Sequence, residues 1–166
     1  MPDLREIQGP LKERYRAEPA AAEITLSATG TLDEGISCSV QTGRALATAG
    51  LHPATGGDGA LLCSGDMLLE ALVACAGVTV RAVATSLELP VRGGTVTADG
   101  DLDFRGTLGV SKEAPVGFRA IRLRFDLDTD ATDEQLDTLL RLTERYCVVL
   151  QTLAGAPALS ASIERA

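Results

Sequence analysis

The residues of this chain most able to do chemistry are its four cysteines: Cys38, Cys63, Cys75 and Cys147. The thiolate form of cysteine is a strong nucleophile, and its availability depends on the pKa of the thiol. Glu144 and Arg145 stand just before Cys147, and a cation beside a thiol lowers its pKa. Cys75 lies instead in an apolar segment. Simple packing is the alternative for both thiols, because free cysteine is among the most buried residue types.

Cys38, Cys63 and the single histidine, His52, allow two other kinds of site. A metal site built from the three is one alternative, but their spacing matches no zinc-binding pattern. A Cys–His hydrolytic pair is another, although the Leu-His-Pro context of His52 is typical of a loop. Cys63 stands beside Ser64, at a predicted helix start, where the helix dipole can acidify a thiol. We expect Cys63 to pack beneath the preceding glycine-rich loop, and we expect no bound metal.

A long apolar helix is predicted from Ser64 to the region between Leu87 and Pro90. Ser64 is a good N-cap, Asp66 places negative charge in the first turn, and Pro90 disfavours helical angles for the residue before it. Apolar side chains occupy more than one face, which predicts a helix enclosed on most sides. One set of short strands supplies too little cover for such a helix, so we expect an obligate dimer.

The composition indicates one compact unit, with 166 residues of which 45% are hydrophobic. The 15 Lys and Arg against 23 Asp and Glu give a net charge of −8 without a visible basic patch, so no nucleic-acid or membrane partner is expected. The charged N-terminus argues against a signal peptide, and Glu70 and Arg81 interrupt the apolar run that a membrane span would need. We therefore expect a cytoplasmic protein, in which four cysteines are not a disulfide scaffold.

The remaining segments predict an α+β fold. Residues 1–20 are expected to form an N-terminal arm with a short helix over Leu11–Glu18, and residues 21–166 a single domain. Alternation or turn signals predict strands over residues 23–32, 36–41, 45–49, 91–104, 118–127 and 159–164. A second helix is predicted from Thr132 to Tyr146, and it either continues or kinks through Cys147.

Two motifs of the chain resemble those of the OsmC/Ohr family. Between Ser64 and Cys75, an acid followed by L-L-x-A-L-x-x-C is similar to the helix that carries the family's first cysteine. Glu144-Arg145-Tyr146-Cys147 resembles the second cysteine motif of an OsmC-like branch. The resemblance covers about residues 22–165. It implies antiparallel sheets wrapped around two central helices in an intertwined homodimer.

The resemblance also implies a function, the thiol-dependent reduction of peroxides. Cys75 would be the peroxidatic thiol and Cys147 the resolving one, in a cycle through a sulfenic acid and a disulfide. An external dithiol would reduce the disulfide, and no organic cofactor would be needed. The apolar surroundings of Cys75 favour an alkyl hydroperoxide as substrate.

The chain departs from the family at the residues that support the first thiol. The family's organic-hydroperoxide enzymes have a glutamate ten residues before that cysteine, where this chain has Gly65; Asp66 matches the acid of another branch. Burial would raise the pKa of Cys75, so an arginine held by an acid is expected to offset it. The supporting candidates are Asp66, Glu70, Glu144, Arg145, Arg44 and Arg16, with Arg14 as a further arginine.

A second class of function is a non-catalytic module on the same dimeric fold. Its apolar pocket would hold a small hydrophobic ligand, and its cysteines would sense the redox state. Turnover separates the two classes, because an enzyme consumes many equivalents of peroxide and a sensor stops after one.

Overall fold

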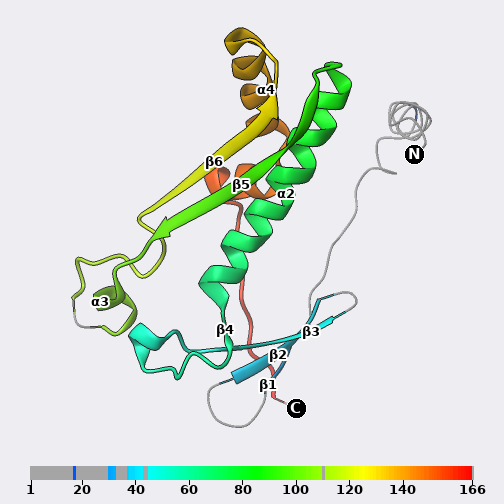
Figure 1. The fold of residues 1–166 in the computed structure, drawn as a ribbon. Coiled ribbons are helices and arrows are strands. Elements are labelled where there is room, and N and C mark those ends of the chain that lie inside the picture. Colours follow the sequence, from blue (N-terminus) through cyan, green and yellow to red (C-terminus); the bar gives the residue numbers. More distant parts are fainter. Residues whose placement is uncertain (1–16, 18–29, 33–36, 43–44, 110, 166) are drawn as a thin grey trace. The chain divides into compact units, whose positions relative to one another are not determined.

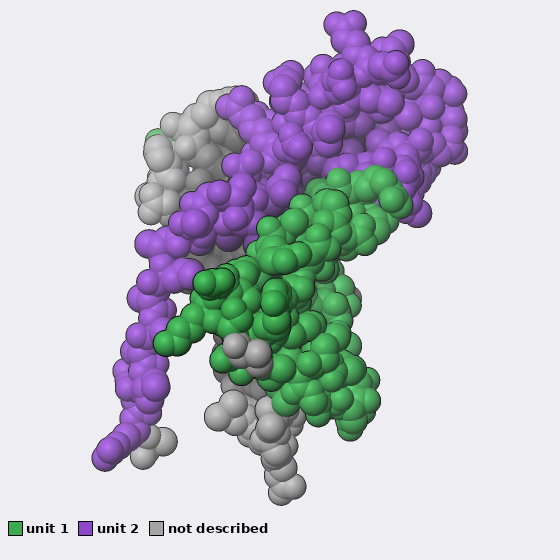
Figure 2. Space-filling view, turned by 90° about the vertical axis from the view of Figure 1, so that its left-hand side faces the viewer, with its two compact units in different colours: residues 1–70, 97–124 green, residues 71–96, 125–166 purple. Residues whose placement is uncertain are grey.

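The computed structural model describes residue 17 and residues 30–32, 37–42, 45–109 and 111–165 (Figure 1). The chain divides into two compact units, one of residues 1–70 and 97–124 and the other of residues 71–96 and 125–166 (Figure 2). Apart from residue 17, the helix predicted over Leu11–Glu18 lies outside the described residues. So does the first part of the strand predicted over residues 23–32.

The first unit contains a four-stranded sheet in the order β1-β2-β3-β4. Its strands are β1 (Gly30–Leu32), β2 (Ser37–Thr42), β3 (Ala45–Gly50) and β4 (Leu62–Cys63). β1 and β2 are antiparallel, as are β2 and β3, which confirms the predicted return of the chain at each turn. β4 pairs with β3 in parallel and places Cys63 opposite Gly50, directly before the long helix.

Two short helices also lie in the described part of the first unit, η2 (Pro53–Thr55) and α3 (Phe104–Thr107). The strand predicted through Phe104 ends earlier, at Asp101, so this part of the prediction was wrong. The reason is local: the Asp103 carboxylate caps α3 by accepting a hydrogen bond from the Arg105 N–H at 3.2 Å. Such a side-chain bond offers the backbone an alternative to the strand ladder.

The long helix α2 (Ser64–Ser86) begins at the predicted residue and ends just before the predicted region of Leu87–Pro90, with Asp66 in its first turn. Its buried residues form one stripe at intervals of four: Leu72, Ala76, Val80 and Ala84. Val78, on another side of the helix, is 73% exposed, so this chain by itself leaves part of α2 uncovered. Among the described helices, α2 alone is long and apolar enough to cross a membrane, a property that core helices of soluble proteins share.

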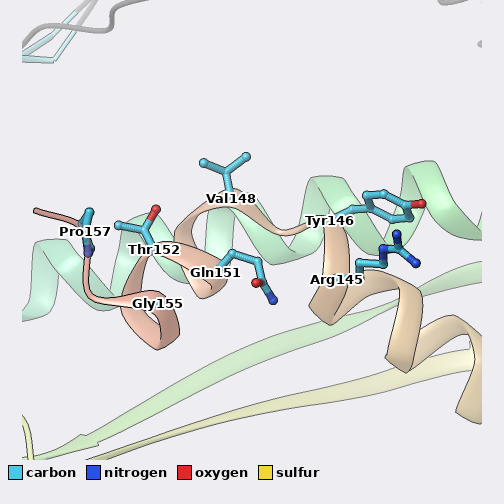
Figure 3. A pocket seen from close by; sticks show the side chains of 7 residues that line it. All are labelled: Arg145, Tyr146, Val148, Gln151, Thr152, Gly155 and Pro157. Carbon is cyan, nitrogen blue, oxygen red and sulfur yellow. The ribbon is translucent and has the colours of Figure 1, made fainter.

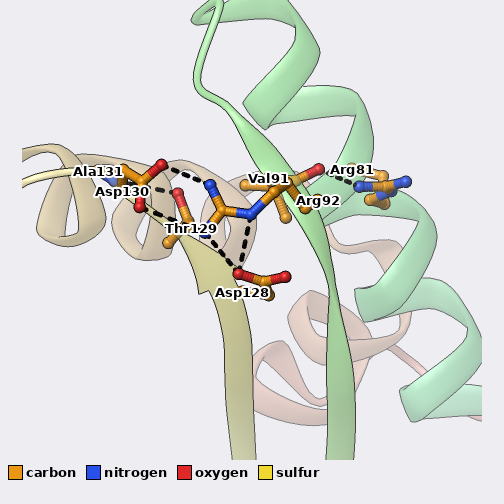
Figure 4. Close-up of polar contacts among 7 residues, drawn as sticks. All are labelled: Arg81, Val91, Arg92, Asp128, Thr129, Asp130 and Ala131. Atoms are coloured by element: carbon orange, nitrogen blue, oxygen red, sulfur yellow. Dashed lines mark hydrogen bonds and ion pairs between the residues drawn. The ribbon is translucent and has the colours of Figure 1, made fainter.

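β5 (Val91–Asp101) and β6 (Ala120–Thr129) form a two-stranded sheet, and their arrows point in opposite directions in Figure 1. Partly buried and exposed residues alternate along all of β6, which confirms the predicted period of two. In the second unit, Arg92 joins the strand ends on the exposed side (Figure 4): its guanidinium donates to Asp128 at 2.6 Å and to Asp130 at 2.5 Å.

The predicted second helix is α4 (Asp133–Tyr146), and its start is specified locally. Thr132 Oγ1 accepts a hydrogen bond from the Gln135 N–H, and the Gln135 side chain accepts one from the Thr132 N–H. This capping box satisfies two N–H groups at the helix start. α4 packs Leu139 against Val80 and Ala84 of α2, and apolar residues of β5 and β6 surround this core.

The last segment of the chain differs from its prediction. After α4 the chain breaks at Cys147 and restarts as α5 (Val148–Gly155). The strand predicted over residues 159–164 is absent from the described chain, where Leu159 is 90% and Ile163 99% exposed. That prediction was wrong because a strand needs a neighbouring strand for its backbone hydrogen bonds, which alternation alone does not supply. The fold class is the predicted α+β, with small sheets and four α-helices in the described residues.

Candidate active site at Cys75 and Cys147

Cys75 and Cys147 lie together in the second unit, although 72 residues separate them in the sequence. Cys75 stands in the middle of α2, and Cys147 forms the junction between α4 and α5. The two thiols are close enough for each to shift the pKa of the other. Both are free thiols, Cys147 fully buried and Cys75 partly buried. The structure therefore brings together the two cysteines that the sequence singled out.

The helix break at Cys147 supplies the hydrogen-bond donors of this site. Cys147 has an extended backbone, with φ −73° and ψ 107°, so α4 ends there and α5 begins at the next residue. The first N–H groups of a helix have no partner within it. The backbone N–H groups of Val148 and Val149 lower the pKa of the Cys75 thiol, and the Leu150 N–H acts in the same direction on Cys147. The start of α5 thus covers both sulfur atoms with amide donors.

The two thiols differ in acidity. Burial raises the pKa of the Cys75 thiol, but hydrogen bonds from the Val149 N–H, the Cys147 thiol and the Val148 N–H outweigh it and lower the pKa overall. Burial also raises the pKa of Cys147, and the adjacent Cys75 raises it further, so that it lies above its ordinary value. The pair therefore favours a thiolate at Cys75 that accepts a hydrogen bond from the thiol of Cys147.

Two threonines belong to the same region. The Thr79 hydroxyl donates to the Cys75 carbonyl at 2.7 Å, and because it has one proton, this bond competes with donation to the Cys75 sulfur. We therefore ascribe the acidity of Cys75 mainly to the amides of α5. Thr143, whose carbonyl accepts the Cys147 N–H at 2.9 Å, is 1% exposed, and its hydroxyl has no partner among the described residues. Such an unpaired hydroxyl costs about 1–3 kcal/mol.

Glu144 and Arg145 lie on the last turn of α4, and both are exposed. The Arg145 guanidinium carbon is 5.5 Å from the centre of the Tyr146 ring, and the Gln151 side chain donates to the Glu144 carbonyl at 2.9 Å. Arg145, Tyr146 and Gln151 line an open pocket of about 430 Å³ (Figure 3). The groups that lower the pKa of Cys75 most are two backbone amides and a thiol. The sequence had instead led us to expect an arginine in this role.

The other predicted supporting residues are not part of the Cys75–Cys147 unit. Asp66 lines a cavity of the first unit together with His52 and Cys63, and Glu70 is exposed on α2. Arg16 and Arg44 lie outside the described residues, as does Arg14. In the described part of the chain, no three His, Cys, Asp or Glu side chains are grouped as a metal site would require.

Sequence reasoning missed the amides of Val148 and Val149 and the hydroxyl of Thr143. The side chains of the two valines carry no chemistry, and their N–H groups become donors only because α4 breaks one residue earlier. Tyr-Cys-Val-Val contains no glycine or proline that would mark the break. Its β-branched valines are the one weak local signal, since they are poorer helix formers than leucine.

Solved structures of similar fold carry related names. An OsmC like protein from Mycoplasma pneumoniae superposes with a TM-score of 0.67 at 17% identity, over 80% of this chain and 89% of that chain. An organic hydroperoxide resistance protein OsmC from Legionella pneumophila gives a TM-score of 0.63 at 16% identity, over 81% and 92%. An organic hydroperoxide resistance protein from Elizabethkingia anophelis gives a TM-score of 0.60 at 15% identity, over 81% of this chain and 91% of that chain. At these identities the likeness shows a shared fold.

The sequence comparison identifies the family. No curated protein matches the chain significantly. The family model for OsmC-like proteins matches residues 57–162, which is more than half of the chain and includes both Cys75 and Cys147. This segment also spans α2, β5, β6 and α4, the elements that position the two thiols. The chain therefore belongs to the OsmC-like protein family.

Proposed function

We propose that this protein is a thiol-dependent peroxidase that reduces organic hydroperoxides with Cys75 and Cys147. The observation that carries the proposal is the contact between two free thiols with opposite pKa shifts, Cys75 lowered and Cys147 raised. A peroxidatic cysteine has to be a thiolate to attack, whereas a resolving cysteine can keep its proton until it is needed. The hydroperoxide resistance proteins among the structural neighbours support the same chemistry.

The cycle has three balanced steps. The Cys75 thiolate attacks the terminal oxygen of the hydroperoxide, the O–O bond breaks, and the alkoxide takes a proton to leave as an alcohol, with Cys75 oxidised to a sulfenic acid. The Cys147 sulfur then attacks the Cys75 sulfur, and water leaves with the proton of Cys147. An external dithiol reduces the resulting disulfide by exchange and restores both thiols.

The amides at the start of α5 have a specific role in this cycle. They stabilise negative charge on the Cys75 sulfur without a bound cation, because the N–H groups of Val148 and Val149 lower its pKa and belong to the positive end of the helix dipole. The thiol of Cys147, which lies beside Cys75, needs little movement to form the disulfide. The site thus activates one thiol and holds the second next to it.

A turnover assay tests the proposal. Purified protein is mixed with excess cumene hydroperoxide and dithiothreitol, and loss of peroxide is followed over many equivalents. We expect continuous turnover for the natural chain and none for Cys75→Ser. Consumption that stops at one equivalent despite fresh dithiol would contradict the proposal and favour a redox sensor on the same fold.

We also propose that the protein works as a homodimer. Val78 is offset by two residues from the buried Ala76 and Val80, so it lies on the opposite side of α2, where it is 73% exposed. An exposed apolar side of a long helix is typical of a surface that a partner covers. Sedimentation at micromolar concentration should give the mass of two chains, and a stable monomer would refute the dimer.

A further inference from the structure

A second chemically equipped cavity lies in the first unit, and the proposed peroxidase cycle does not use it. It has a volume of about 200 Å³. Its apolar walls are Leu69, Leu102, Phe104 and Phe118, and its polar groups are His52, Cys63 and Asp66. A thiol, an imidazole and a carboxylate therefore share one cavity with two aromatic rings.

The imidazole of His52 is held in one orientation. Its ring stacks on Phe104, with centroids 5.0 Å apart and planes 17° from parallel. Its Nδ1 accepts a hydrogen bond from the Ala54 N–H at 3.0 Å, so the proton of the neutral ring resides on Nε2. His52 thus offers the cavity one hydrogen-bond donor, and its ring cannot turn without losing both contacts.

The thiol of Cys63 faces an opening that exists because residue 65 is glycine. Cys63 is fixed by the pairing of β4 with β3. A Cβ at position 65 would lie 3.5 Å from Cys63 Sγ and also 3.5 Å from Phe118 Cζ. The sulfur and the ring therefore border the same small space, which a single methyl group at residue 65 would occupy.

Size and charge narrow the class of ligand. A dry cavity of roughly 150 Å³ holds benzene, so about 200 Å³ accommodates one ring or a branched alkyl group with a few more atoms. The Asp66 carboxylate at the cavity and the net charge of −8 disfavour an anionic ligand. Of the three cysteines whose side chains the structure describes, Cys63 alone lines the cavity, and Cys75 follows it by twelve residues, about three turns of α2. A sulfenic acid at Cys63 would thus have no resolving thiol beside it among these three, whereas thiol–disulfide exchange needs none.

We propose that this cavity is a separate thiol site, where Cys63 captures a small uncharged disulfide that carries one ring or a branched alkyl group. The Cys63 thiolate attacks the sulfur that bears the apolar group, after its proton passes to solvent. A new S–S bond forms, the S–S bond of the ligand breaks, and the other sulfur leaves as a thiolate. The ligand is the oxidant in this step, and a second thiol reverses it. This site is independent of the proposed peroxidase activity.

Labelling kinetics on the full chain test the proposal. Benzyl methanethiosulfonate and methyl methanethiosulfonate transfer a benzylthio or a methylthio group to a cysteine thiolate, and both release methanesulfinate. The rate of modification at Cys63 is measured for each by peptide fragmentation and mass spectrometry, and the benzyl-to-methyl ratio is divided by that of N-acetylcysteine. We expect a corrected ratio of about ten or more, because the cavity buries the ring.

Two alanine variants of α2 make the test specific. Gly65→Ala should return the corrected ratio to about one, since its methyl group takes the space between Cys63 Sγ and the Phe118 ring. Gly77→Ala is the matched control: it also replaces a helix glycine, but its Cβ would meet only Val96 at 3.8 Å, so the ratio should stay high.

Three results would overturn the proposal. One is a ratio near one in the natural chain, and another is an equal loss of the ratio in Gly65→Ala and Gly77→Ala. The third is oxidation of Cys63 by cumene hydroperoxide faster than that of Cys75, which would make the cavity a peroxide site. A third reagent, the anionic 2-sulfonatoethyl methanethiosulfonate, tests the selection against negative charge. Its rate at Cys63 relative to the methyl reagent, divided by the same ratio for N-acetylcysteine, should be below one. A corrected ratio of one or more would refute this selection.

Discussion

Cys63 and Cys75 are twelve residues apart, one directly before α2 and the other within it, but their surroundings offer different chemistry. Two backbone amides and a second thiol lower the pKa of Cys75. The Cys63 sulfur borders a cavity with aromatic walls, one imidazole and one carboxylate. The first environment changes the acidity of a thiol and gives it a partner, and the second gives a thiol room for a ligand. The groups beside the sulfur therefore distinguish two sites that share a residue type.

The largest expected effect separates the two sites by serine substitution of one cysteine in each. Cys147→Ser should stop peroxide consumption after one equivalent, because the Cys75 sulfenic acid then has no resolving thiol. Cys63→Ser should leave turnover largely intact, because that thiol belongs to the other site. The measurement is peroxide loss with dithiothreitol in excess. Loss of turnover in a folded Cys63→Ser protein would show that the thiols are wrongly paired.

The next effect concerns the core that supports the thiol pair. Leu139 is 1% exposed and packs against Val80 and Ala84. Leu139→Ala should lower the free energy of unfolding by about 2–5 kcal/mol, as expected for a cavity left in a core. Leu140 is 44% exposed, so Leu140→Ala should change the free energy of unfolding by about 0.5 kcal/mol or less. Urea unfolding measures both, and equal losses would contradict the assigned core.

A smaller effect tests the amide donors of Cys75. Val148 is the first residue of α5, where proline is tolerated, and the extended backbone of Cys147 suits a residue before proline. Val148→Pro removes one N–H donor and should raise the pKa of Cys75, so that the rate of peroxide reduction reaches its plateau at higher pH than in the natural chain. Val148→Ala keeps the N–H and should leave the pH–rate profile in place; an unchanged profile in both variants would exclude this donor.

The smallest effect lies in the first unit, at Asp103. A hydrogen bond from the exposed Arg105 side chain lowers the pKa of this carboxyl from 3.8 to about 2. A lowered folded-state pKa contributes stability above pH 3.8, and this contribution is lost as the pH falls toward 2. Asp103→Asn keeps a capping residue for α3, but its side chain does not titrate, so the variant lacks the pH-dependent contribution to stability.

Acid titration of unfolding measures the contribution of Asp103. The difference in stability between the natural chain and Asp103→Asn should be small at neutral pH, because exposed ion pairs are screened. It should shrink between about pH 4 and pH 2. A difference that grows as the pH falls would have the wrong sign and would refute the ion pair.

Much of the fold could be predicted from local patterns. The capping box at Thr132 and Gln135, the alternation along β6, and the acid in the first turn of α2 each involve residues close in the sequence. The failures were also instructive. Asp103 ended a predicted strand by capping a helix, and residues 159–164 alternate without a strand beside them. In both cases a competing or missing hydrogen-bond partner decided the structure.

The sequence by itself determined α2, β6 and α4, because helix and strand periods and caps depend on residues within a few positions of each other. It also singled out Cys75 and Cys147 through two motifs. Only the tertiary structure decided that the N–H groups of Val148 and Val149 face Cys75 and that His52, Cys63 and Asp66 share a cavity. These arrangements join residues far apart in the chain. Every residue type except proline has a backbone N–H, and a cavity is not a residue at all, so neither can be recognised from the sequence.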